Sequence, residues 1–408
     1  MVEARSSVSP ESSRNIRAFG ATSFLNDTAS EMAYWVLPAF LASIGAGPAK
    51  LGLIEGIAES VASFAKFFSG YLADRIPRRK PIVVGGYVVA NAVKPLLALA
   101  TSWWPVLFIR FADRFSKGIR GTARDVMVAE AIKQERLGSA YGLIQAMDSA
   151  GAIAGPLAAL FLLSRYGHRG VFWAAGIPGL FCILVAVFGI HETRRASRGA
   201  SQADIGVHGR GTPDQNSWFA LRANFPAAFY YVLFAVTLFS LGNSSDMFLV
   251  LRAQNIGIAA SRAPMLGLVF NITYTLISWP AGLFSDRFSR RVIAAAGYLV
   301  FAVVYFVFGL APSKLAIWSA MAFYGLFYAL TNPVLKALVV DTVSESVRGR
   351  ALGLYFFVTS IATLLASILT GELWKYFGPA VPFYFSAAIA VLSTLLLLAS
   401  RRQPLSNK

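Results

Sequence analysis

The chain has 408 residues, of which 56% are hydrophobic and 14% charged, and its formal net charge is +17. The apolar residues form long blocks instead of the one-sided stripes of water-soluble helices, so these features exclude a soluble globular protein. A bilayer core about 30 Å thick requires roughly 20 apolar residues per spanning helix. Because lipid offers no partner to an unpaired backbone group, we predict an all-α integral membrane protein.

In chain order, the apolar blocks predict twelve transmembrane helices. We expect the spans at 17–44, 49–74, 79–101, 103–131, 138–164, 169–191, 224–251, 263–285, 291–311, 314–341, 350–375 and 379–400. Polar side chains interrupt the first span, and five basic side chains lie in the fourth. A simple hydropathy threshold is therefore expected to miss both of these spans.

The basic residues are distributed unequally between the two predicted sides of the membrane. Of the 37 Lys and Arg residues, 25 fall on one side, seven on the other and five within spans. Short loops rich in Lys and Arg remain in the cytoplasm. We therefore predict a multi-pass protein of the inner or plasma membrane with both termini cytoplasmic. The same asymmetry accounts for the net charge, so no nucleic-acid partner is expected.

Composition argues against several other classes of function. The single cysteine, Cys182, permits no intramolecular disulfide, and the three histidines lack metal-ligand spacing. No phosphate-binding Gly-x4-Gly-Lys-Ser/Thr loop occurs. A channel would need rings of like residues around a pore, whereas the polar positions here are scattered over unlike helices. We expect no enzyme activity, no cofactor and no metal site.

The chain divides into two halves that repeat a motif. We expect an N-terminal six-helix bundle at 1–191, a polar cytoplasmic linker at 192–222 and a C-terminal six-helix bundle at 223–408. The pattern Gly-x3-Asp-Arg-x2-Arg-Arg follows the second span as Gly70, Asp74, Arg75, Arg78 and Arg79, and the eighth span as Gly282, Asp286, Arg287, Arg290 and Arg291. A weaker echo pairs Ser30-Glu31-Met32 with Ser245-Asp246-Met247. Parallel repeats of this kind place a substrate between two lobes.

With this repeated motif the chain resembles the major facilitator superfamily over nearly its whole length. It departs from the superfamily signature at the second glycine, which is Pro77 in one copy and Ser289 in the other. The resemblance implies two pseudo-symmetric six-helix bundles, alternating access and function as a monomer. The two motif copies would form a cytoplasmic gate. The alternative is that their charges only cap helices and fix topology.

Two further patterns are similar to superfamily motifs. Arg114-x3-Gly118 in the fourth span resembles a motif whose arginine is associated with proton transfer. Gly151-x3-Gly155-Pro156 in the fifth span resembles part of a signature common in exporters. The alternative for Gly151, Gly155 and Pro156 is helix packing and kinking, because small residues four apart are a general packing device.

Charged residues inside spans are costly in a bilayer and therefore mark candidate site residues. Asp27 and Glu31 lie four apart in the first span, and Arg110 and Arg114 lie four apart in the fourth, beside Asp113. In the fold that the sequence resembles, both helices line the central cavity, so we expect an acidic ridge to face a basic ridge. Protonating an acid would break its ion pair and change the preferred state. The alternative is a permanent structural ion pair.

Other polar and aromatic positions are weaker candidates for contacts to a solute. They are Asp148, Asp246, Asn271, Tyr324 and Tyr328, and the alternative for each is a role in helix packing. Glu55 in the second span is expected at the outer interface, in contact with solvent. Asp341, near the inner end of the tenth span, is expected to be a snorkelling or gate residue.

Together these features predict a secondary active transporter, with the bilayer, a small solute and protons as its partners. We favour proton-coupled export of drug-like or amphipathic compounds. Uptake of an anionic metabolite is the alternative, because Arg110 and Arg114 would suit a carboxylate or phosphate. A more remote alternative is a membrane protein that does not transport, or a channel.

Overall fold

The computed structural model describes residues 10–75, 78–131, 137–192, 225–287, 289–344 and 347–399, and every regular element in these ranges is helical. The first part of the chain forms α1 (Pro10–Tyr34), α2 (Leu37–Ser43), α3 (Pro48–Arg75), α4 (Lys80–Val93), the 3-10 helix η1 (Lys94–Leu99), α5 (Trp103–Ala131) and α6 (Leu137–Gly189). The second part forms α7 (Ala227–Gly242), α8 (Met247–Asn255), the 3-10 helix η4 (Ala260–Arg262), α9 (Ala263–Arg287), α10 (Arg290–Leu310), α11 (Lys314–Val340), α12 (Arg348–Phe377) and α13 (Val381–Ala399).

These helices trace the twelve predicted spans. The first span is broken into α1 and α2, and the seventh into α7 and α8. The third continues from α4 into η1 at Lys94, where the following Pro95 cannot supply a helical N–H group. The fifth and sixth spans run together in α6, whose one non-helical residue is Gly167, at φ 64° and ψ −174°. A positive φ of this kind favours glycine, and it makes the turn between the two spans.

Hydropathy alone detects fewer spans than the fold contains. Within the described ranges, seven segments are long and apolar enough to cross a membrane, and one of them, Gly142–Gly189, holds two spans. The helices α1 and α5 fall below this threshold, as expected, and so does the described part of α3. The ion pairs described below explain this result for α3 and α5, because both helices carry charged side chains into the interior.

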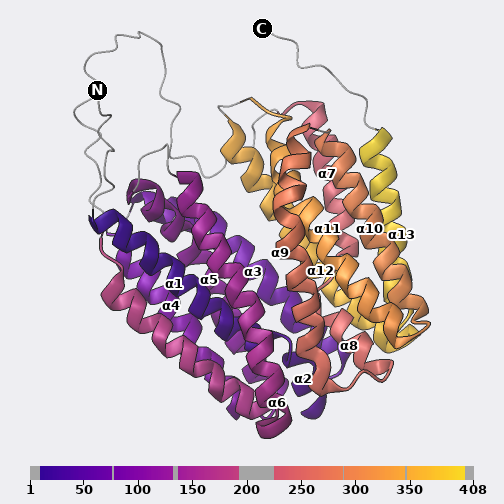
Figure 1. Cartoon of the computed structure of the whole chain (residues 1–408). Coiled ribbons are helices and arrows are strands. Elements are labelled where there is room, and N and C mark those ends of the chain that lie inside the picture. The colour runs from indigo at the N-terminus through magenta and orange to yellow at the C-terminus, as the bar shows by residue number, and fades with distance from the viewer. Residues whose placement is uncertain are drawn as a thin grey trace.

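The helices pack into two groups (Figure 1). In the first half, α1 packs on α6 and α5 packs on both α3 and α4; in the second half, α10 packs on α11 and α13, and α9 packs on α11. The halves meet where α3 contacts α12, α6 contacts α9 and α2 contacts α8. The expected linker, 192–222, lies outside the described residues except for its first position.

The contact between the halves is closest at the end of the molecule that holds α2 and α8, which we call the opposite end. Figure 1 shows the halves well separated at the other end, where α1 begins and α13 ends, which we call the terminal end. Small residues allow the close approach of α3 and α12: a side chain at Gly52 would collide with the backbone of Ser367. Ser60 also donates to the Ser360 carbonyl at 2.8 Å. The structure is therefore closed at the opposite end.

Candidate functional site

A ladder of two buried ion pairs joins α3 to α5. Glu55 and Glu59 lie one turn apart on α3, and Arg110 and Arg114 lie one turn apart on α5. Arg110 donates from Nε and Nη2 to the two carboxylate oxygens of Glu55, each at 2.7 Å. Arg114 Nη2 lies 2.9 Å from Glu59 Oε1. The two-point contact fixes Arg110 and Glu55 in one orientation.

This ladder corrects two predictions. We expected Asp27 and Glu31 to oppose the arginines, but no ion pair joins them in the described part of the chain, and Glu31 lies only within electrostatic range of Arg114. We also expected Glu55 to contact solvent, whereas its side chain has no exposed surface. The physical reason is that α5 turns its arginines toward α3, where two glutamates at the same helical spacing receive them.

Gly118 explains why α5 lies so close to α3. A Cβ atom at this position would lie 2.5 Å from the carbonyl oxygen of Ala62 and 2.5 Å from the Cβ of Ala65, both on α3. The glycine therefore permits close approach of the two helices one turn after Arg114. In this structure, the motif Arg114-x3-Gly118 combines an ion-paired arginine with a helix-packing position.

A third buried ion pair lies beside the ladder. Lys94 Nζ is 3.2 Å from Asp113 Oδ1, and Asp113 Oδ2 is 3.8 Å from Arg110 Nη1. Only 3% of Lys94 is exposed, and its ammonium also donates to the Ala90 carbonyl at 3.2 Å and to Asn91 Oδ1 at 3.3 Å. These partners compensate for burying a charge that would otherwise be expensive.

Asparagine side chains extend this network to α1. Asn91 Nδ2 donates to Asn26 Oδ1 at 3.3 Å, and Asn26 Nδ2 donates to Asp27 Oδ1 at 3.0 Å. A continuous polar network therefore crosses four spans, through Asp27, Asn26, Asn91, Lys94, Asp113, Arg110 and Glu55. Neither Lys94 nor Glu59 was predicted to be a site residue. Glu55 and Glu59 have the same i, i+4 spacing as the two arginines, and this match could have predicted the ion pairs between α3 and α5.

The α1 carboxylates face α6 and the break between α1 and α2. Glu31 accepts a hydrogen bond from Trp35 Nε1 at 2.7 Å. A Cβ atom at Gly155 would lie 2.7 Å from the Cβ of Glu31, and one at Gly151 would lie 3.1 Å from the Cβ of Asp27. The Gly151-x3-Gly155-Pro156 pattern thus lets α6 pack closely on α1, which supports its interpretation as a packing device.

Trp35 contacts both Glu31 and the second half of the chain. Its ring centroid lies 6.2 Å from that of Phe270 on α9, and a side chain at Gly267 would overlap the indole. Nearby, Asn271 Nδ2 donates to the Ala152 carbonyl of α6 at 2.8 Å. The side chain of Asn271 therefore links the two halves directly.

Asp246 lies at the break between α7 and α8. The α7 helix ends at Gly242, and Asp246 directly precedes α8. Its Oδ1 accepts from Tyr324 at 2.6 Å and from Tyr328 at 3.1 Å, and its Oδ2 accepts from Tyr328 at 3.0 Å. The expected equivalence with Glu31 is inexact, because Glu31 lies within α1, one turn before Trp35. Asp246 lies in the unwound segment itself.

Aromatic rings from α9 and α11 surround this carboxylate. The Phe270 centroid lies 5.1 Å from that of Tyr328 and 5.6 Å from that of Tyr324, and the Tyr274 centroid lies 6.1 Å from that of Tyr328. Tyr274 and Tyr328 are half-buried, whereas Tyr324 is fully buried. The predicted candidates Asp246, Tyr324 and Tyr328 thus meet in one cluster, which we call the Asp246 cluster.

The Asp246 cluster faces the ion-pair ladder across the interface between the halves. The carboxylates of Glu55 and Glu59 are close enough to Asp246 to repel it. Tyr34 of α1 lies between them: the guanidinium carbons of Arg110 and Arg114 are 5.6 Å and 5.8 Å from its ring centroid. Tyr34 is also within electrostatic range of Asp246. These residues form the candidate site.

Asp148 occupies a separate position nearer the terminal end. It is half-buried and lies within electrostatic range of Asp27 and Arg124. Arg124 Nε donates to Asp125 Oδ1 at 3.0 Å, and its Nη1 donates to Ser23 Oγ at 3.0 Å. Asp148 therefore belongs to the environment of Asp27 and not to the Asp246 cluster.

The repeated motif lies at the terminal end of both halves. The side chains of Gly70, Asp74, Arg75, Gly282, Asp286 and Arg287 lie outside the described part of the structure. Arg78 is exposed, and the backbone N–H groups of Arg79 and Lys80 donate to Glu192 at 3.0 Å and 3.1 Å. In the second copy, Arg290 Nη1 donates to both carboxylate oxygens of Asp341 at 2.6 Å. Each copy is thus held by a carboxylate from the same half.

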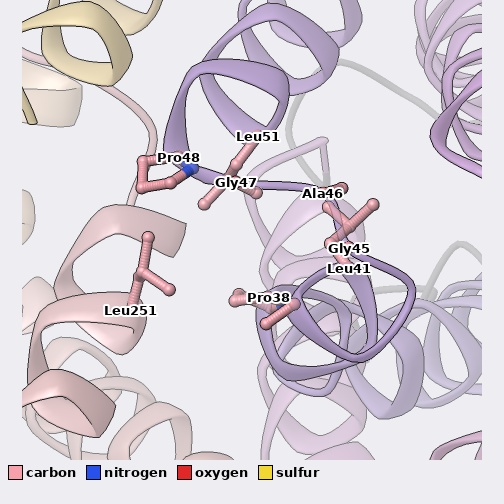
Figure 2. A pocket seen from close by; sticks show the side chains of 9 residues that line it. Pro38, Leu41, Gly45, Ala46, Gly47, Pro48, Leu51 and Leu251 are labelled. Carbon is pink, nitrogen blue, oxygen red and sulfur yellow. The ribbon is translucent and has the colours of Figure 1, made fainter. Parts of the chain in front are cut away.

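An apolar cavity of about 310 Å³ lies at the opposite end (Figure 2). Leu251 of α8 faces Pro38 and Leu41 of α2 and Pro48 at the start of α3. No lining side chain is ionisable. Because a solute site needs polar groups that fix orientation, we do not assign the transport site to this cavity.

Comparison with known proteins identifies the family. The family model of the Major Facilitator Superfamily matches residues 19–252 and 232–408. The chain belongs to this superfamily, so it is a multi-pass membrane transporter of small solutes and not an enzyme. The predicted resemblance and fold class are confirmed.

Individual relatives agree with this assignment. An uncharacterized MFS-type transporter of Methanocaldococcus jannaschii is 33% identical over 95% of each chain. Multidrug resistance protein 1 of Bacillus subtilis is 29% identical over 34% of this chain and 35% of its own length. Among solved structures, a mutant of the nucleoside transporter NupG has a TM-score of 0.75 at 14% identity, covering 94% of this chain and 99% of its own. A D-xylose-proton symporter has a TM-score of 0.71 at 15% identity, covering 95% and 97%.

Proposed function

We propose that this transporter is coupled to protons and exports a drug-like or amphipathic compound by alternating access between its two halves. The observation that carries this proposal is the contact chain from Glu31 through Trp35 to α9. A titratable carboxylate in one half accepts a hydrogen bond from an indole at 2.7 Å, and that indole packs against Gly267 and Phe270 of the other half. The charge on Glu31 is therefore linked to the fit between the halves.

Protonation of Glu31 acts on this link in two ways. It weakens the hydrogen bond from Trp35, because a charged acceptor holds an N–H group more strongly than a neutral one. It also removes the repulsion between Glu31 and Asp27, which lies one turn away on the same helix face. Both effects change the stability of the closed opposite end, and a proton thereby shifts the balance between the two states.

Charge distribution supports the orientation of the protein in the membrane. The loops on the side of the termini carry most of the Lys and Arg residues, which supports a cytoplasmic location of this side by the positive-inside rule. The structure, which is closed at the opposite end, then corresponds to a state open toward the cytoplasm. We further propose that the protein works as a monomer, in the inner or plasma membrane, with its halves moving as two lobes.

The proposed direction of transport rests on one relative and on the pairing of Glu55 and Glu59 with the two arginines. The partial match to a multidrug resistance protein of Bacillus subtilis supports export. Uptake of an anionic metabolite receives less support, because Arg110 and Arg114 already pair with Glu55 and Glu59. An arginine in a buried ion pair has to lose that partner before it binds an anion.

The test uses purified protein in liposomes with an imposed pH gradient. A cationic dye and an organic anion are supplied in parallel, and their accumulation is measured with and without a protonophore. We expect protonophore-sensitive movement of the cation, and we expect Glu31→Gln and Asp27→Asn to uncouple it from the gradient. The control is Glu372→Gln, an exposed carboxylate on α12. Unchanged coupling in both site variants would overturn the proposed role of α1.

A further inference from the structure

The Asp246 carboxylate has no ion-pair partner among the described residues. Across the interface from it, Lys94 pairs with Asp113, Arg110 with Glu55 and Asp113, and Arg114 with Glu59. Asp246 faces this group, yet in the part of the chain that the structure describes its recorded polar contacts come from the hydroxyls of Tyr324 and Tyr328 alone. The tyrosines orient the carboxylate but do not neutralise it.

The Asp246 carboxylate retains capacity for a further partner. Two carboxylate oxygens offer about four acceptor positions, whereas two hydroxyl donors serve both oxygens here. Oδ2 accepts from Tyr328 alone, at 3.0 Å. The side chain is half-buried, so it is accessible to a solute while being shielded enough from water for its charge to act strongly.

The helix break adds buried polar groups close to Asp246. The hydroxyls of Ser244 and of Tyr305 on α10 are buried, and Tyr305 interacts with Ser244 and with Tyr324. Tyr305 is within electrostatic range of Asp246, and its ring lies 6.1 Å from that of Tyr324. Buried hydroxyls normally have partners. Breaks in transmembrane helices near the middle of the bilayer are recurrent sites of solute and ion binding in transporters.

The surrounding rings are suited to an apolar cation. Phe270, Tyr274 and Tyr328 present aromatic surface next to the carboxylate, and Tyr34 approaches from the first half. Aromatic faces attract cations through their quadrupole, and the same faces bury apolar groups. Glu55 and Glu59, each paired with an arginine, lie within electrostatic range of Asp246 from across the interface.

We propose that Asp246, with Phe270, Tyr274 and Tyr328, forms a subsite for a monovalent organic cation that carries aromatic or other apolar groups. This inference rests on the proposed transport function and names its substrate class. The cationic centre lies next to the Asp246 carboxylate, and the apolar groups lie against the three rings. An anion of the same shape is repelled by Asp246.

The test compares two ions of nearly the same size and opposite charge, tetraphenylphosphonium and tetraphenylborate. Binding to the purified full chain in nanodiscs is measured by equilibrium dialysis at one pH, with empty nanodiscs subtracted. We expect saturable binding of tetraphenylphosphonium alone. Asp246→Asn should weaken it by about tenfold or more, because the variant removes the negative charge that attracts the cation at a site shielded from water. Asp246→Glu should retain most of the affinity.

Further variants separate charge from folding. Tyr274→Leu removes a ring while leaving Asp246 in place, and we expect a several-fold loss of affinity; Tyr376→Phe, at an exposed ring on α12, should have no effect. Equal binding of both ions, or wild-type affinity in Asp246→Asn, would overturn the subsite. If Asp246→Asn does not fold, Tyr274→Leu decides: wild-type affinity for tetraphenylphosphonium in this variant would overturn the subsite. The binding assay has no proton gradient. Its result therefore stands even if the proposal of proton-coupled export is wrong.

Discussion

Trp35 donates its indole N–H to the Glu31 carboxylate at 2.7 Å, from one turn further along the chain and at the point where α1 ends. Trp35→Phe removes this bond and keeps an aromatic ring against α9. We expect the rate of proton-coupled transport to fall by about tenfold, since a hydrogen bond to a charged group contributes about 1.5–3 kcal/mol. The measurement is gradient-driven flux in proteoliposomes. Trp104→Phe, at an exposed indole on α5, is the control; equal effects of both changes would refute the role of the Trp35 N–H.

Gly267 provides the space that the Trp35 ring occupies. In Gly267→Ala the new methyl group would overlap the indole, so the state closed at the opposite end should become less stable. We expect slower transport and greater reactivity of a cysteine placed at Leu41 toward a membrane-impermeant thiol reagent. The matched control is Gly85→Ala on α4, where an added Cβ meets no atom within 4 Å. Unaltered labelling in Gly267→Ala would show that this contact does not hold the end closed.

Glu55 should be essential for stability as well as transport. In Glu55→Gln the guanidinium of Arg110 stays buried without its bidentate partner, and breaking a buried pair from one side typically costs about 3–5 kcal/mol. We expect a clear fall in the thermal unfolding temperature in detergent. The double variant Glu55→Leu with Arg110→Met should recover much of the loss, because it removes both charges. A double variant no more stable than Glu55→Gln would contradict this account.

The fold was largely predictable from the sequence, because it depends on block hydropathy and on the repeated motif. The predicted span 103–131 coincides with α5, and 263–285 differs from α9 only at its C-terminal end. The breaks in the first and seventh spans were not predicted. In the first span the break falls at Trp35 and Val36, where composition does not reveal a local loss of helix. In the seventh span the run Gly-Asn-Ser-Ser-Asp at 242–246 was a loop signal that could have indicated the break.

The candidate site was predicted only in part, because residue spacing identifies a helix face but not the helix that it meets. Asp246 and the pair Tyr324 and Tyr328 were identified separately, and their contact depends on how α7 packs against α11. The arginines were correctly expected to have acidic partners. The partners were assigned to α1 instead of α3, because Glu55 was taken to be solvated near a predicted membrane boundary. A charge near a predicted boundary is ambiguous until the tilt and neighbours of its helix are known.

Lys94 should act as a structural centre of the polar network. Lys94→Met keeps the length of the side chain but removes the cation nearest to Asp113, whose other ion-pair partner among the described residues is Arg110 at 3.8 Å. We therefore expect a lower unfolding temperature. Lys94→Met with Asp113→Leu should be more stable than Lys94→Met alone, because no charge is left uncompensated. Lys50→Met, at an exposed residue near the opposite end, is the control. Equal stability of Lys94→Met and wild type would show that the pair contributes nothing.

Cross-linking tests whether the halves must separate between α6 and α9 during transport. Asn271 Nδ2 lies 2.8 Å from the Ala152 carbonyl of the other half, so cysteines at both positions in a Cys182→Ser background should be joined by a short bifunctional thiol reagent. If the halves alternate, the joined protein keeps its fold, loses most of its transport, and regains it when the linker is cleaved by reductant.

The matched control joins two helices of the same half. Ser69 Oγ donates to the Ile119 carbonyl at 2.6 Å, a similar side-chain to backbone contact between α3 and α5. A cysteine pair at these two positions should cross-link and leave transport largely intact, because no relative motion of these helices is required. If the Ala152 and Asn271 pair is fully cross-linked and transport continues at the wild-type rate, the two halves do not separate there and the alternating-access proposal is wrong. If both pairs stop transport, the block arises from the reagent and not from the contact between the halves. A longer linker between Ala152 and Asn271 then decides, because it should restore transport only if separation of the halves was blocked.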